Sequence, residues 1–223
     1  MKKIFYSSLF ILFLTSLAIA QEEKPKGPER WEETIQKFEA SDKENPKPEG
    51  ANLFVGSSSF AIWKDIQDYF PDYQIINRGF GGSNYEDLLY YVDRVVIPYK
   101  PAKVFIYEGD NDIARGDEVK DILKRVKKVR KIIKKKLPET EVAILAAKPS
   151  IRRWELADEY IKLNQELDLF ACKTDKTEFV DVWNPVIGED GKVFDHIFLE
   201  DNLHMNAEGY KIWQKIIEPY LVK

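Results

Sequence analysis

Short apolar runs alternate with longer amphipathic segments along almost the whole chain from residue 51 onward. The runs have the length and residue types of buried strands and lie at 51–55, 73–77, 102–107, 141–147 and 177–182. The segments between them carry apolar residues at helical spacing and lie at 59–69, 84–95, 117–137, 155–172 and 206–221. Continuous apolar strands that alternate with amphipathic helices favour a parallel sheet with helices on both faces. The sequence therefore predicts a three-layer α/β fold with a five-stranded parallel sheet in the flavodoxin-like order.

Residues 1–20 have the pattern of a cleaved signal peptide. Lys2 and Lys3 precede an apolar stretch at 4–17, and Ala18-Ile19-Ala20, with small residues at its first and last positions, provides a cleavage signal. We expect cleavage after Ala20 and a secreted or periplasmic protein. The apolar stretch is too short to span a membrane, and no cysteine follows the cleavage signal, so we expect no stable membrane anchor.

Residues 21–50 are rich in Pro, Glu and Lys and are predicted to form a charged linker with one amphipathic helix. Trp31, Ile35 and Phe38 fall on one face of that helix, which favours packing on the neighbouring domain. Residues 51–223 are predicted to form that domain, whose length is ordinary for a single core.

The net charge argues against a general nucleic-acid-binding protein, and the cysteine count excludes a fold held by an intrachain disulfide. The formal net charge is −4, so a surface that generally binds nucleic acid is not expected. The basic face of segment 117–137 could hold an acidic polysaccharide or a membrane surface, but a solvated face is the favoured interpretation. Cys172 is the only cysteine, so no intrachain disulfide can form, and its place beside apolar helix positions predicts a buried side chain.

Three serines, Ser57 to Ser59, stand where the first strand ends and a helix begins. The first turn of a helix has unpaired N–H groups that favour negative charge. This position suits a serine nucleophile or a bound phosphate, although serine most often caps a helix there.

Three other polar segments lie at comparable positions. They are residues 77–83 after the second strand, 108–112 after the third strand, and 201–204 before the last helix. His204 lies three residues after Asp201, a spacing that lets the carboxylate reach the imidazole through one turn. An ester hydrolase needs such a pair to activate its nucleophile, together with donors for the oxyanion.

The four segments together resemble the four sequence blocks of the SGNH hydrolases, the GDSL-like esterases and lipases. The chain is most similar to a bacterial subgroup with Gly-Ser-Ser-Ser, Asn-Arg-Gly-Phe-Gly-Gly and Pro-Ser-x-x-Arg-Trp segments. The resemblance extends from about Trp31 to Leu221. It implies hydrolysis of carboxylic esters by a Ser-His-Asp triad, with neither a metal nor another cofactor.

The resemblance also implies individual roles. Ser58 is the expected nucleophile, His204 the general base and then acid, and Asp201 the group that orients the imidazole. The expected oxyanion donors are the N–H groups of Ser58 and Gly82 and the side chain of Asn111. Ser57 replaces the aspartate of the family's Gly-Asp-Ser block, so no substrate preference is carried over from those relatives.

Two arginines and a second histidine in or near these segments are also candidates for a role at the site. Arg78 and Arg153 are candidate substrate-binding residues, and a structural ion pair with Asp110 or Asp112 is the alternative for either. His196 is expected to line or support the site.

Asp110 and Asp112 are expected to be water-exposed loop acids. A metal-dependent hydrolase that uses both carboxylates with His204 remains an alternative.

The expected substrate is a short acyl ester, above all an acetyl ester, of a carbohydrate or other small molecule. The expectation of a short acyl group rests on the short loops, which favour a shallow site. The alternatives are a lipase or lysophospholipase of the same fold and a non-catalytic module that binds a phosphate or a sugar.

Overall fold

The computed structural model describes residues 27–223, so the predicted signal peptide lies outside it. Five parallel strands form one sheet in the order β2-β1-β3-β4-β5, which confirms the predicted flavodoxin-like order. The strands are β1 (Asn52–Gly56), β2 (Ile75–Gly79), β3 (Lys103–Tyr107), β4 (Glu141–Leu145) and β5 (Thr177–Val180).

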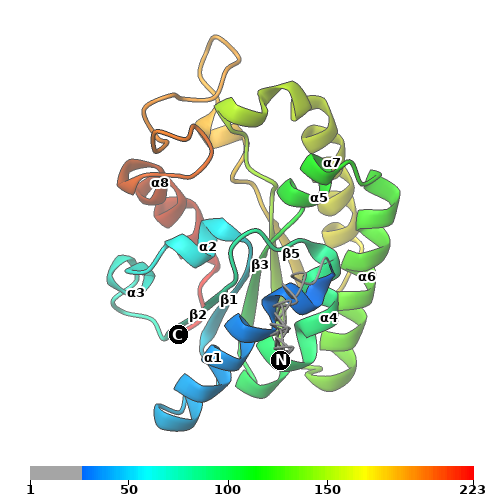
Figure 1. Cartoon of the computed structure of the whole chain (residues 1–223), viewed down its shortest axis with the longest axis vertical. Coiled ribbons are helices and arrows are strands. Elements are labelled where there is room, and N and C mark those ends of the chain that lie inside the picture. Colours follow the sequence, from blue (N-terminus) through cyan, green and yellow to red (C-terminus); the bar gives the residue numbers. More distant parts are fainter. Residues whose placement is uncertain (1–26) are drawn as a thin grey trace, which may run out of the picture.

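Helices cover both faces of this sheet, as predicted (Figure 1). The helices α4 (Tyr85–Val95), α6 (Val119–Lys136) and α7 (Ala157–Cys172) lie on one face, and α2 (Ser58–Ile62), α3 (Ile66–Tyr69) and α8 (Ala207–Ile217) lie on the other. The other helices are α1 (Glu32–Glu44), α5 (Asp110–Arg115), η1 (Pro28–Trp31), η2 (Ile97–Tyr99), η3 (Ile151–Leu156), η4 (Asn184–Val186) and η5 (Glu218–Tyr220). Within residues 27–223, none of the helices combines the length and apolar character needed to cross a membrane.

An aromatic core fixes α8 against the sheet and α2. The ring of Trp213 on α8 lies 6.1 Å from that of Phe60 and 5.2 Å from that of Tyr107, measured between centroids. The Tyr210 hydroxyl donates a 2.8 Å hydrogen bond to the carbonyl of Ser59. Because large aromatic rings bury much apolar surface in defined geometries, this packing holds α2 and α8 in place over the sheet.

The predicted helix over 59–69 is wrong in one respect, because the chain forms two short helices there. Trp63 has φ −74° and ψ 71°, which is not helical. The Asn77 side chain on β2 donates hydrogen bonds to the carbonyls of Phe60 (2.8 Å) and Trp63 (3.1 Å). These bonds satisfy carbonyls that a continuing helix would have paired, so α2 ends after one turn.

Helix α1 packs on the domain, as its apolar face predicts. Arg94 on α4 bonds to Glu32 and Glu39, each at 2.7 Å, and Ile35 is fully buried. The helix ends at Glu44, within the segment 21–50 that was predicted to be a charged linker with one amphipathic helix.

The prediction that Cys172 is buried is wrong. Cys172 is exposed, and its Sγ lies 3.6 Å from Asp168 Oδ1 on the outer face of α7. The buried side of α7 carries Tyr160, Leu163 and Leu167, and residue 172 lies one turn beyond Asp168 on the opposite side.

Candidate active site

A glycine turn brings the serine segment to the carboxyl edge of the sheet. Gly56 has φ +136°, and a Cβ there would lie 2.1 Å from the Tyr107 carbonyl oxygen, so only glycine fits. The N–H of Ser57 donates to the same carbonyl at 3.0 Å. The turn therefore places Ser58 at the first position of α2, over the ends of β1 and β3.

Ser58, His204 and Asp201 form a continuous chain of hydrogen-bonded groups. Ser58 Oγ lies 3.0 Å from His204 Nε2, and His204 Nδ1 lies 2.5 Å from Asp201 Oδ2. A carboxylate on Nδ1 favours the tautomer that carries its proton there, which leaves Nε2 able to accept the serine proton. The three residues that the sequence assigned to one site are thus brought together.

Asp201 is held as a carboxylate. Its Oδ1 accepts hydrogen bonds from the backbone N–H groups of Leu203 (3.0 Å) and His204 (2.9 Å). Partial burial acts to raise the pKa of Asp201, but these bonds and the imidazole outweigh it and hold the pKa well below its usual value. The negative charge beside the imidazole therefore persists over the neutral pH range.

Lys148 anchors the same loop, a role that the sequence analysis missed. It follows β4, is buried, and donates a 2.6 Å hydrogen bond from Nζ to the Leu203 carbonyl. Burial lowers the pKa of Lys148 to about 8, against the attraction of Asp110. The sequence signal for this role was the position of Lys148 directly after an apolar strand and before Pro149. A lysine that is buried at such a position needs a partner.

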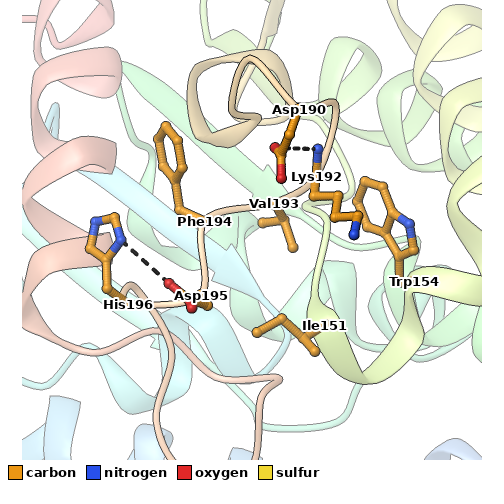
Figure 2. A pocket seen from close by; sticks show the side chains of 8 residues that line it. All are labelled: Ile151, Trp154, Asp190, Lys192, Val193, Phe194, Asp195 and His196. Carbon is orange, nitrogen blue, oxygen red and sulfur yellow. Dashed lines mark hydrogen bonds and ion pairs between the residues drawn. The ribbon is translucent and has the colours of Figure 1, made fainter.

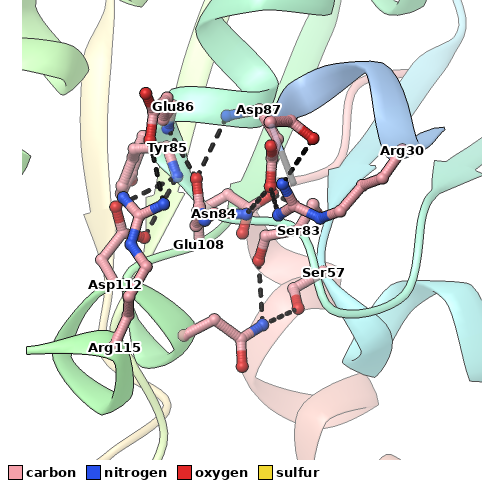
Figure 3. A network of polar contacts seen from close by, with 12 residues as sticks. Arg30, Ser57, Ser83, Asn84, Tyr85, Glu86, Asp87, Glu108, Asp112 and Arg115 are labelled. Atoms are coloured by element: carbon pink, nitrogen blue, oxygen red, sulfur yellow. Dashed lines mark hydrogen bonds and ion pairs between the residues drawn. The ribbon is translucent and has the colours of Figure 1, made fainter. Parts of the chain in front are cut away.

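Asn111 has a fixed carboxamide at the start of α5. Its Nδ2 donates to Ser57 Oγ at 2.6 Å and to the Ser83 carbonyl at 2.9 Å, and its Oδ1 accepts from Arg153 Nη2 at 3.0 Å. Arg153 therefore sets which way the amide points. Ser57, which the sequence analysis treated only as a missing aspartate, is the acceptor that orients the amide nitrogen (Figure 3).

The backbone N–H groups of Ser58 and of Gly82 have no acceptor within residues 27–223. Gly82 has φ +86° and lies in the loop after β2. This loop is close to the serine, since a Cβ at Gly81 would lie 3.8 Å from Ser58 Cβ. The Asn111 amide is bonded to Ser57 and Ser83, the neighbours of these two residues, so the three donors lie on adjoining segments.

Trp31 supports this glycine loop from the N-terminal segment. A Cβ at Gly82 would lie 3.6 Å from the Trp31 ring, and that ring packs edge-on against Phe80 at 6.0 Å between centroids. Sequence reasoning placed Trp31 on a helix outside the domain and gave it no part in the site. The contact spans about fifty residues, so helical periodicity does not reveal it.

Arg78 is not brought to this cluster. Its guanidinium donates to the Tyr99 hydroxyl at 2.6 Å and to the Asn77 carbonyl at 2.7 Å, and it pairs with Asp42 of α1. The structure thus gives Arg78 a structural contact instead of a place at the triad. Arg153 lies 3.7 Å from Asp110 Oδ2, so one of the two predicted alternatives, a structural ion pair, is present for it.

Asp110 and Asp112 are buried, which corrects the expectation that both are exposed loop acids. Asp110 accepts from the Tyr107 hydroxyl at 3.1 Å, and Asp112 accepts from the Tyr85 N–H at the start of α4 at 3.0 Å. Helix starts and buried hydroxyls need such acceptors. Within residues 27–223, no group of three or more His, Cys, Asp or Glu side chains is arranged to hold a metal ion.

Another buried acid, Glu108, lies in the network with Asp112 (Figure 3). The Ser83 hydroxyl donates to Glu108 Oε1 at 2.6 Å. Burial raises the pKa of Glu108 well above its usual value, and burial raises that of Asp112 to about 7. The backbone carbonyl of Ser83 accepts the hydrogen bond from Asn111 Nδ2, so Ser83 connects Glu108 to the Asn111 amide.

The buried Asp112 predicts a pH dependence of stability. Its pKa is about 7 in the folded protein and 3.8 in the free side chain, so between these values the folded state holds a proton that the unfolded state has lost. The free energy of unfolding should therefore fall as pH rises through this window, by up to about 1.4 kcal/mol per unit from this group. Asp112→Asn should remove that fall in urea unfolding at pH 5, 6, 7 and 8.

Asp117→Asn is the matched control for this measurement. Bonds from Arg115 and Arg125 outweigh the effect of burial and lower the pKa of Asp117, so its titration lies below the same window. Equal slopes against pH in the wild type and in Asp112→Asn would contradict the prediction.

His196 lies away from the triad. It is exposed on the long connection between β5 and α8, 3.8 Å from Asp195 and stacked on Phe194. It lines a hollow on the surface.

Comparison with known proteins assigns the chain to a family. Residues 50–212 match the model of the GDSL-like Lipase/Acylhydrolase family. None of the curated proteins compared with the chain matches it.

Solved structures have the same fold. A protein from Streptococcus pneumonia, provisionally named a platelet activating factor, is 25% identical with a TM-score of 0.76, over 85% of this chain and 92% of that one. A GDSL-like lipase from Bacteroides thetaiotaomicron is 22% identical with a TM-score of 0.71, over 83% and 96%. An acetyl esterase mutant solved with an acetate ion is 15% identical with a TM-score of 0.60, over 76% and 95%. By the family match, which covers most of its length, the chain belongs to the GDSL-like lipase/acylhydrolase family of ester hydrolases.

Proposed function

We propose that this protein is an exported serine esterase that removes short acyl groups, above all acetyl groups, from carbohydrate or other small esters. The observation that carries the catalytic part is the relay from Ser58 through His204 to Asp201, with contacts of 3.0 and 2.5 Å. A module that only binds a phosphate or a sugar has no need of an imidazole oriented in this way.

In the proposed reaction, Ser58 Oγ attacks the ester carbonyl while His204 Nε2 takes its proton. His204 then gives that proton to the leaving alcohol oxygen, and an acyl-serine remains. Water, activated by the same imidazole, releases the acid and restores the serine. Asp201 keeps the imidazole oriented and stabilises its positive charge in both steps.

The oxyanion would be held by the N–H groups of Ser58 and Gly82 and by Asn111 Nδ2. The two N–H groups have no other acceptor within the described residues, which supports their part. Both amide hydrogens of Asn111 already have acceptors, so it must share or release its bond to Ser57 Oγ when the oxyanion forms.

Asn111→Ala should lower kcat by on the order of 10²–10³ with little change in KM, because this donor acts mainly in the transition state. Steady-state kinetics with p-nitrophenyl acetate measure both constants. A fall in kcat below about tenfold would mean that the amide stays on Ser57 and does not reach the oxyanion.

The preference for a short acyl group is supported by the long connection between β5 and α8. Its apolar residues Ile197 and Phe198 are buried against the domain, so they offer no exposed apolar surface to an acyl chain. A matched groove would gain about 0.8 kcal/mol for each buried CH₂ group, and a shallow site gains little.

Catalytic efficiency should therefore be highest for acetyl or propionyl esters and fall with chain length. Kinetics with p-nitrophenyl acetate, butyrate, octanoate and palmitate in one buffer test this. A maximum of kcat/KM at octanoate or beyond would favour the lipase alternative. Loss of activity with EDTA, restored by a divalent metal, would favour the metal-dependent alternative.

Export is supported by the sequence of residues 1–20, with its two lysines, apolar stretch and small residues before position 21. N-terminal sequencing of the protein from a secreting host should find Gln21 first.

A further inference from the structure

Three adjoining hollows form an open groove on the surface built by η3, α7 and the connection from Trp183 to Glu200. Their volumes are about 510, 400 and 380 Å³, and each falls within the range of about 300–1,000 Å³ typical of small-molecule sites. The first and second share Trp154, and the second and third share Trp183, Ile161 and Asn184. Each hollow is therefore larger than one acetyl group requires.

The first hollow starts next to the catalytic loop. Its walls are Ile151 and Trp154 of η3 on one side and residues 192–196 on the other (Figure 2). The Arg152 N–H donates to the Asn202 carbonyl at 3.0 Å, and Asn206 Nδ2 donates to the His196 carbonyl at 2.7 Å. Both walls are thus bonded to the loop that carries Asp201 and His204.

This position assigns the groove to the alcohol part of the ester. His204 passes its proton to the leaving oxygen, so the alcohol must lie on the imidazole side of the reacting carbonyl. The triad residues and the proposed oxyanion donors line none of the three hollows, so the link between groove and site is made by the walls. These walls are bonded to the loop of Asp201 and His204, which places the groove on the side of that loop.

Flat aromatic surfaces line this path. Trp154 borders two of the hollows and is backed by Trp183, with ring centroids 6.2 Å apart and planes 16° apart. Phe194 lies across the first hollow and stacks on His196 at 5.5 Å. Rings held in this way present rigid faces to a ligand that is flat and weakly polar on one side.

The polar groups along the groove are mainly acidic or carboxamide. Carboxylates outnumber the single lysine, Lys192, among the lining residues, and include Glu155, Asp158, Asp168, Asp181, Asp190 and Asp195. Carboxylates accept hydrogen bonds from hydroxyl groups and repel anions. A ligand rich in hydroxyls and without negative charge fits these walls, whereas a fatty chain would remove their hydration without replacing it.

We propose that this groove binds a neutral oligosaccharide chain that carries the ester, with Trp154 as the stacking surface nearest the triad. The inference rests on the proposed esterase function and names the substrate class of that site. The ester bond that breaks joins the acyl carbon to a sugar oxygen. That oxygen takes the proton from His204 and leaves as a hydroxyl.

The test compares chain lengths on one enzyme. For monoacetylated xylose, mannose and glucose and the matching β-1,4-linked hexasaccharides, at least one series should show a rise in kcat/KM of about tenfold or more from monosaccharide to hexasaccharide. Trp154→Ala should abolish most of that rise, mainly through KM, because one aromatic contact is worth about tenfold in affinity. Oligogalacturonate acetates should show no such rise.

Two variants separate the groove from general damage. Trp154→Phe keeps a stacking ring and should retain most of the rise. Tyr90→Ala removes an exposed aromatic ring from α4, outside the groove, and should leave the ratio of hexasaccharide to p-nitrophenyl acetate efficiency unchanged. Thermal melting verifies that each variant is folded.

The outcomes distinguish the inference from the function on which it rests. If the wild type cleaves no ester at all, the esterase proposal fails. If it cleaves p-nitrophenyl acetate but no series shows a chain-length rise, or if Trp154→Ala lowers both efficiencies equally, only the groove assignment fails. A selective loss on p-nitrophenyl octanoate in Trp154→Ala would show that the groove takes an acyl chain.

Discussion

Ser58→Ala should reduce kcat for p-nitrophenyl acetate by on the order of 10⁴–10⁶, the largest effect of any single substitution in this protein. The alanine removes the only atom that can form the acyl-enzyme, and it leaves His204 without a proton to accept. Residual turnover should come from the oxyanion donors and from substrate binding alone.

The neighbouring hydroxyls provide the control. Ser59→Ala makes the same change one residue further on, at a buried position that does not contact His204, and should retain a substantial fraction of activity. Ser57→Ala should also retain a substantial fraction, although it removes the acceptor of the Asn111 amide. Comparable losses in all three variants would mean that disturbance of the turn, and not loss of a nucleophile, lowers the rate.

Asp201→Asn should lower kcat by on the order of 10⁴ while leaving the fold intact. The amide oxygen can still accept from the backbone N–H groups of Leu203 and His204, so the loop keeps its shape. The amide cannot act as an anion at His204 Nδ1, so the imidazole takes the wrong tautomer and its positive form loses its partner.

Asp121→Asn, on the exposed side of α6, removes a carboxylate that pairs with Lys124 and should not change kcat. A loss below about tenfold in Asp201→Asn would show that the 2.5 Å contact with His204 is a structural bond without a catalytic part.

Much of the fold and of the site followed from local sequence pattern. The apolar runs predicted each strand of the sheet, and parallel strands place their carboxyl ends on one edge. Ser58, Asn111 and the glycine loop all follow such ends, so they had to approach one another. The Asp201 to His204 spacing fixed the remaining contact, because three residues make one turn.

The parts that were not predicted depend on contacts between distant segments. Arg78 follows a strand, like the site residues, but Asp42 lies 36 positions earlier and captures its guanidinium. In the sequence Asp112 has the features of a loop acid. Its role as an acceptor depends on its contact with the start of α4 in the structure. The groove beside Trp154 has walls from η3 and from the connection after β5. No periodicity in either segment predicts that the two lie next to each other.

Ser57 shows how one substitution in a motif can be reinterpreted from structure. In the sequence it is only the residue that stands where many relatives have aspartate. In the structure its hydroxyl receives the Asn111 amide, while Arg153 holds the other end of the same carboxamide. The preorganisation of that donor is therefore shared by residues from three separate segments.

The most direct test of the central claim is covalent labelling with a fluorophosphonate, followed by proteolysis and mass spectrometry of the peptides. The proposed mechanism predicts a single adduct on Ser58, loss of esterase activity in proportion to labelling, and almost no labelling in His204→Ala. An adduct on Ser57 or Ser59, or full esterase activity in protein that is labelled completely at Ser58, would contradict it.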